Sequence, residues 1–160
     1  VSATIAQRPA CTRARQACSC SSAVARGAPV SCRSSDRLGL KACTPRASAA
    51  CSALVQAGRC AMVALTLGAD GALLVTAQGA WRADALPVPV AGTVGAGDSF
   101  VGAWACALVR GDAPDEQLRQ AVAASAATVQ AGGTALCDPA RVRELAPQVR
   151  VRAGPAALPP

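Results

Sequence analysis

The chain has 160 residues, 52% of them hydrophobic, which is enough for one domain with a buried core. No apolar run approaches the roughly 20 residues that a membrane-spanning helix needs, so we expect no membrane partner. The formal net charge of +7 is local: residues 1–60 hold nine Arg and Lys against Asp36 alone, whereas acidic side chains outnumber basic ones in residues 61–160.

Residues 1–46 are rich in Arg, Ser and Cys and lack aromatic residues and periodicity, which predicts an irregular or disordered segment. Its arginines could contact nucleic-acid phosphates, although no aromatic stacking partner accompanies them, and the composition is also typical of an organellar transit peptide. A zinc site or a disulfide framework is disfavoured, because the closest cysteines are Cys18-x-Cys20 and no apolar signal region precedes them. We favour a further hypothesis, out-of-frame translation of a GC-rich gene, which yields the same composition.

Regular structure is predicted from Ala47 onward. Residues 47–56 favour a short helix, and the continuous apolar run 62–67 predicts a strand buried on both faces. Residues 68–71 predict a turn, and residues 72–76 the partner strand. Taken alone, this Asp-Gly turn would be an ordinary hairpin.

Residues 81–90 favour an extended segment, in which Pro87 and Pro89 exclude a central strand. We therefore expect an edge or a connecting segment. Trp81 is predicted to pack locally and not to contact a ligand.

A glycine-rich run precedes a predicted helix over residues 100–109, and its sequence is Gly92-Thr93-Val94-Gly95-Ala96-Gly97-Asp98-Ser99-Phe100. Three glycines in six positions let backbone N–H groups turn toward an anion at the positive end of that helix. The spacing is similar to a P-loop, but Asp98 occupies the place of the phosphate-binding lysine. Asp98 repels phosphate and is better suited to act as a general base. The alternative is a plain helix N-terminus capped by Asp98 or Ser99.

Two further helices are predicted after Gly111. The first begins at Pro114 and reaches Gly132-Gly133, and the second runs from Asp138-Pro139 to about Val149. Helices and strands in alternation indicate an α/β fold. The tail, residues 151–160, is predicted to be disordered.

The segment from Gly92 to Gly102 resembles the C-terminal signature of the ribokinase-like (carbohydrate kinase) family. Residues 66–74, Thr-Leu-Gly-Ala-Asp-Gly-Ala-Leu-Leu, resemble the nucleotide-loop motif that precedes this signature in the family. The amino-acid sequence of these two motifs is most similar to the branch that phosphorylates sugar phosphates, above all bacterial 1-phosphofructokinase. The resemblance covers residues 47–150, which would be a partial nucleotide-binding domain from the C-terminal part of a three-layer ribokinase-like fold.

The resemblance implies an ATP-dependent kinase of a sugar phosphate, with fructose 1-phosphate giving fructose 1,6-bisphosphate, and with ATP and Mg²⁺ as cofactors. Asp98 would contact the substrate and take the proton of its hydroxyl, while backbone N–H groups stabilise the transferred phosphoryl group. Those N–H groups belong to Gly95, Ala96 and Gly97. The nucleotide would be bound, mainly through backbone groups, by Thr66, Leu67, Gly68, Ala69, Asp70, Gly71 and Gly97. No metal ligand is assigned.

Two features of the family pattern are missing. The family places magnesium with an upstream Asn-x-x-Glu element, but the chain has no asparagine, and its only glutamates are Glu116 and Glu144. Residues 1–46 also have no counterpart of the sugar-binding half. The alternative is therefore a truncated, non-catalytic remnant, or a basic segment that binds nucleic acid. For a complete family member we expect a cytoplasmic enzyme and a homodimer.

Overall fold

The computed structural model describes residues 3–6, 40–131, 135 and 137–154. Within these residues, five strands form one sheet in the order β1-β2-β3-β4-β5, and every neighbouring pair is antiparallel. The strands are β1 (Ala3–Ala6), β2 (Met62–Thr66), β3 (Ala72–Thr76), β4 (Gly79–Ala83) and β5 (Val151–Gly154).

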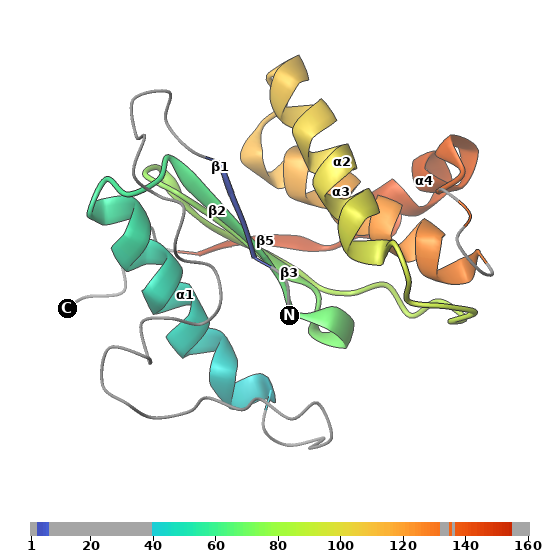
Figure 1. The fold of residues 1–160 in the computed structure, drawn as a ribbon, viewed down its shortest axis with the longest axis horizontal. Coiled ribbons are helices and arrows are strands. Elements are labelled where there is room, and N and C mark those ends of the chain that lie inside the picture. Colours follow the sequence, from blue (N-terminus) through green and yellow to red (C-terminus); the bar gives the residue numbers. More distant parts are fainter. Residues whose placement is uncertain (1–2, 7–39, 132–134, 136, 155–160) are drawn as a thin grey trace.

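Helices cover both faces of the sheet, which gives three layers (Figure 1). One face carries α1 (Leu40–Gln56), and the other carries α2 (Ala96–Arg110) and α3 (Pro114–Gln130), with α4 (Pro139–Leu145) packed on α3. No helix in this described part is long and apolar enough to cross a membrane.

Each face of the sheet has its own apolar core, because successive side chains of a strand point to opposite faces. Ala64 and Leu74 belong to the larger core under α2 and α3, whereas Val63 and Leu73 belong to the smaller core under α1. The prediction that the run from Met62 is buried on both faces is confirmed by the buried centre of β2.

The turns follow the sequence signals closely. Gly111 ends α2 with a φ of 77°, Pro114 begins α3, and the Asp138 side chain caps α4 by accepting a hydrogen bond from the Ala140 N–H at 2.9 Å. The one-turn helix Ala146–Gln148 then continues α4 to Val149, as predicted. The expected end of α3 at Gly132-Gly133 lies outside the described residues.

Residues 84–95 connect β4 to α2 without a strand, so both prolines lie in a connecting segment, as expected. Trp81 itself is on β4, between β3 and β5, and it packs half-buried against the core under α2 and α3. Its local packing is therefore confirmed, but its strand is central and not an edge.

Besides the start of α2, which lies at Ala96 and not at Phe100, two predicted boundaries are wrong. The first helix begins at Leu40 and not at Ala47. Good helix formers precede Ala47. Pro45 lies close to the N-terminus of the helix, where it removes only one backbone hydrogen bond. Two parts of residues 1–46 are thus regular, β1 and the start of α1. The irregular structure expected for residues 7–39 lies outside the described part of the chain.

The second wrong boundary is the C-terminal tail, since Val151–Gly154 forms β5 and is not disordered. The strand pairs with β4, and Arg152 Nη2 donates a hydrogen bond to Asp84 Oδ2 at 2.6 Å. Backbone pairing with β4 thus orders a segment whose composition alone gives no strand signal. Residues 155–160 lie outside the described part.

Candidate active site

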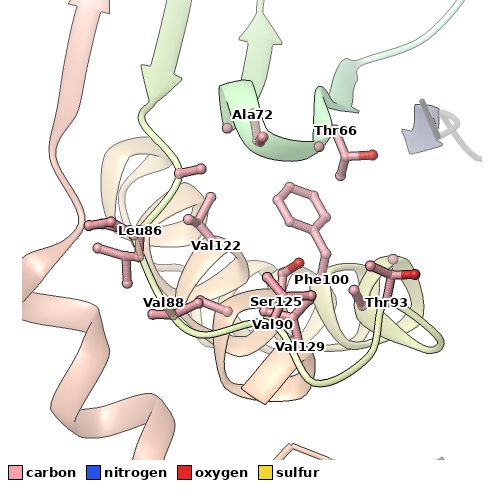
Figure 2. Close-up of a pocket in the computed structure, with 18 residues that line it drawn as sticks. Thr66, Ala72, Leu86, Val88, Val90, Thr93, Phe100, Val122, Ser125 and Val129 are labelled. Carbon is pink, nitrogen blue, oxygen red and sulfur yellow. The ribbon is translucent and has the colours of Figure 1, made fainter. Parts of the chain in front are cut away.

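A cavity of about 650 Å³ lies where the β2–β3 turn, the segment 84–95, α2 and α3 meet (Figure 2). This volume is within the range of small-molecule sites, roughly 300–1,000 Å³. The residues that line it are Thr66, Gly68, Ala69, Gly71, Ala72, Ala85, Leu86, Pro87, Val88, Val90, Thr93, Ala96, Gly97, Phe100, Val122, Ser125, Ala126 and Val129.

The walls of the cavity are apolar, with a few hydroxyl groups among them. Figure 2 shows the Phe100 ring rising from α2 toward the β2–β3 turn, between Thr66 and Ala72. Ser125 of α3 and Thr93 of the connecting segment add hydroxyl groups to the lining. A flat, largely apolar ring system with polar edges suits such a lining.

The β2–β3 turn forms one side of the cavity and is a short 3₁₀ helix, η2 (Gly68–Asp70). Gly68 and Gly71 have φ values of 62° and 89°, which favour glycine. The turn is closed by the Leu67 N–H, which donates to the Gly71 carbonyl at 2.8 Å, and by the Gly71 N–H, which donates to the Gly68 carbonyl at 3.1 Å. Two backbone hydrogen bonds thus close the turn.

Of the six residues of this turn predicted to bind a nucleotide, four line the cavity: Thr66, Gly68, Ala69 and Gly71. Leu67 does not, because its side chain is buried in the core under α1. Asp70 does not line the cavity either, although its N–H donates to the Leu67 carbonyl at 3.2 Å within the turn. Any contribution of these two residues to a ligand would come through the shape of the turn.

The glycine-rich run forms the opposite side of the cavity. Gly95, with a φ of 79°, caps α2 through its backbone, and Ala96 and Gly97 line the cavity from the first turn of the helix. Asp98 is exposed in the same turn and is not among the lining residues. The alternative in which Asp98 or Ser99 caps the helix is wrong, because both lie inside α2 and no side chain caps it.

The positive end of α2 therefore meets the cavity at Ala96 and Gly97. The Ala96 N–H lies 3.4 Å from the Thr93 carbonyl, a long hydrogen bond that an anion could replace. Asp98 is the acidic residue of this first turn. The structure thus brings together a donor-rich helix end, a turn closed by its own backbone and one exposed carboxylate.

Sequence reasoning missed two walls of the cavity. Residues 85–90 of the connecting segment form one, and the α3 residues Val122, Ser125, Ala126 and Val129 form the other. The apolar, proline-rich stretch between the two motifs was a usable signal for the first wall. The second has no local signal, because it depends on how α3 packs against α2.

Metal ligands do not cluster in the described part of the chain, where no group of three or more His, Cys, Asp or Glu side chains could hold an ion. Magnesium is usually held by one or two carboxylates together with substrate phosphates. The described residues suit only that shared type of site.

The sequence profile of the pfkB family carbohydrate kinases matches residues 39–141. The ATP-dependent 6-phosphofructokinase isozyme 2 of Mycobacterium tuberculosis is 37% identical over 94 residues, and the 1-phosphofructokinase of Escherichia coli is 41% identical over 78 residues. These matches cover 59% and 49% of this chain, but only 28% and 25% of the two relatives.

Solved structures show the same partial likeness. Phosphofructokinase-2 from Escherichia coli, in complex with substrates and products, superposes with a TM-score of 0.60 at 33% identity, over 62% of this chain and 32% of that one. Arabidopsis thaliana ribokinase, complexed with ribose and ATP, gives a TM-score of 0.51 at 33% identity, over 54% and 29%. The predicted ribokinase-like fold is confirmed, and the chain spans about a third or less of the length of these relatives.

Proposed function

Because the chain belongs to the pfkB family of carbohydrate kinases, we propose that its cavity binds ATP and that Asp98 serves phosphoryl transfer to a sugar phosphate. The observation that carries this proposal is the meeting of two turns, distant in sequence, at one cavity. Gly68 and Gly71 line it from the β2–β3 turn, and Ala96 and Gly97 line it from α2. The apolar walls suit a purine ring, and the end of α2 suits phosphates.

Three groups of residues would have separate roles in phosphoryl transfer. The turn of residues 66–71 would lie along the nucleotide, and the N–H groups of Gly95, Ala96 and Gly97 would stabilise charge on the transferred phosphoryl group. Asp98 would accept the proton of the sugar hydroxyl, a role for which an exposed carboxylate beside the helix end is suited. ATP supplies the phosphoryl group, and magnesium would reach the site together with the phosphates.

We propose fructose 1-phosphate as the acceptor, with fructose 1,6-bisphosphate as the product. Support comes from the sequence of the signature motif, Gly92 to Gly102, and from relatives named 1-phosphofructokinase and 6-phosphofructokinase. For the complete protein we also propose a homodimer in the cytoplasm. Because the chain spans only about a third or less of its relatives' length, we keep a second candidate function. It is a non-catalytic remnant that retains the nucleotide cavity.

The test is the substitution Asp98→Asn, assayed as ADP formation that requires both ATP and fructose 1-phosphate. We expect kcat to fall by roughly 10²- to 10⁴-fold, because the neutral amide cannot accept the proton, while the Kd of ATP changes little. Asp115→Asn is the control, since Asp115 is also an acidic residue in the first turn of a helix, α3, and is not among the residues that line the cavity. It should retain wild-type turnover.

The outcomes separate the two candidates. Unchanged turnover in Asp98→Asn would remove Asp98 from the mechanism. ATP binding by the wild-type chain without any turnover would support the non-catalytic remnant.

A further inference from the structure

We propose that Thr128, near the C-terminus of α3, is a positioning residue that fixes the phosphate-binding end of α2 through Ser99. The inference rests on the proposed function of this site. Thr128 is buried, with 3% of its surface exposed, and it is not among the residues that line the cavity. A polar side chain this deeply buried requires partners, and those partners identify its role.

The hydroxyl of Thr128 links two helices. Its Oγ1 lies 3.0 Å from the Ala124 carbonyl oxygen and 2.7 Å from Ser99 Oγ. A carbonyl can only accept, and a hydroxyl carries one proton, so Thr128 donates to Ala124 and accepts from Ser99. Ser99 is thereby held to α3, directly after Asp98 in the first turn of α2.

The Thr128 side chain also lies near Gly95, at the start of the same turn. A Cβ atom placed on Gly95 would lie 3.7 Å from Thr128 Cγ2, so a side chain at this position would come into van der Waals contact with Thr128. Gly95 has a φ of 79° and caps α2, and its carbonyl accepts the hydrogen bond of the Ser99 N–H at 2.9 Å. Thr128 thus bonds to the first turn at Ser99 and lies near its start at Gly95.

The next residue of α3 holds the start of the glycine-rich run. The Val129 carbonyl accepts hydrogen bonds from the N–H groups of Ala91 and Gly92, at 2.8 and 3.2 Å. The C-terminal turn of α3 therefore contacts the run at its beginning and at its end. Between these two contacts, Thr93, Ala96 and Gly97 line the cavity.

This arrangement assigns α3 the task of keeping the N–H groups of the run in place before a ligand arrives. Preorganised donors act on phosphate without further rearrangement, whereas a displacement of about 1 Å can cost up to a hundredfold in rate. Loss of the Thr128 hydroxyl should therefore weaken the interaction with phosphates and leave the apolar walls intact.

The test compares ATP with adenosine, which lacks the phosphates, in titrations of the full chain. Thr128→Val keeps the size of the side chain and removes the bond to Ser99, and we expect its ATP affinity to fall roughly tenfold. Its adenosine affinity should stay within about twofold of wild type, because the walls of the cavity do not change. Thr128→Ser retains the hydroxyl and should restore ATP affinity.

A second variant removes the hydrogen bond between Thr128 and Ser99 by changing Ser99. Ser99→Ala should show the same selective loss of ATP affinity, and the double variant should be no worse than either single one, because both remove one interaction. This pair also keeps the inference testable if Thr128→Val unfolds. Ser99 lies outside the cavity lining, so its loss removes no direct wall contact.

The outcomes are distinct. Equal losses of ATP and adenosine affinity, or no loss of either, in the variants would overturn the role of Thr128 while leaving the proposed function in place. A wild-type chain that binds neither ligand would overturn the proposed function, and the positioning role with it.

Discussion

The guanidinium of Arg82, on β4, has an unfavourable environment in the sheet. Its Nε atom is buried without a hydrogen-bond partner, and in the register of the sheet Arg82 faces Arg152 of β5 directly. Arg152 has the Asp84 carboxylate as its partner, whereas the structure gives Arg82 none in the described residues. Like charges opposite one another and an unsatisfied buried donor are both unfavourable.

We therefore predict that Arg82→Leu stabilises the chain by about 1 kcal/mol, as a higher midpoint in urea unfolding. Arg152→Leu is the matched control on the neighbouring strand. It removes the repulsion and also an exposed ion pair worth about 0–1 kcal/mol, so its midpoint should change less. A lower midpoint for Arg82→Leu would mean that its guanidinium is stabilising in the fold.

Single residues were predictable where a local motif fixes them. The sequence places Asp98 beside Gly97 at the start of a helix, and the structure, in which α2 begins at Ala96, puts it inside the first turn. Leu67 could not be assigned in this way, because whether its side chain faces the cavity or the core under α1 depends on how the end of β2 packs. The role of Thr128 had no local signal either, since its partner Ser99 is 29 residues away in the chain.

At the scale of the elements, the β2–β3 turn depends on two glycines with different surroundings. Both have positive φ, but a Cβ atom on Gly71 would lie 2.0 Å from the Ala83 carbonyl oxygen, whereas nothing lies within 4 Å of a Cβ on Gly68. The substitution Gly71→Ala therefore meets both strain and collision with the backbone of β4. Gly68→Ala meets strain alone.

We predict that Gly71→Ala lowers the free energy of unfolding by more than about 3 kcal/mol and opens the turn. Gly68→Ala should cost about 1–2 kcal/mol, the ordinary cost of an L-residue in the left-handed region. Chemical denaturation of both variants measures the difference. Equal losses would show that the contact between the turn and β4 does not form.

The elements with strong end signals were predictable, and those without them were not. Gly111, Pro114 and Asp138 mark helix ends that the structure reproduces. The start of α1 lacks such a signal, and β5 is a four-residue strand whose order comes from its pairing with β4. Short elements that depend on a distant partner are set by tertiary contacts and not by local propensity.

For the whole molecule, the two motifs and the α/β class were readable from the sequence, and the cavity between them was not. The cavity exists because α3 packs on α2 and brings Val122 and Ser125 opposite the β2–β3 turn. That packing includes the buried bond from Trp104 Nε1 to Gln117 Oε1, at 3.2 Å. This cavity, lined by residues between Thr66 and Val129, is the proposed nucleotide site.

The most direct test is a titration of the ¹⁵N-labelled full chain with ATP and Mg²⁺, followed by backbone amide chemical shifts. We predict that the amides of Gly68, Gly71, Ala96 and Gly97 shift together and saturate along one binding curve. Adenosine should shift the amides at the apolar walls, such as Val122 and Ser125, and leave Ala96 and Gly97 largely unchanged. If ATP shifts none of these amides, or only those of the basic residues 1–46, the chain has no nucleotide site at this cavity.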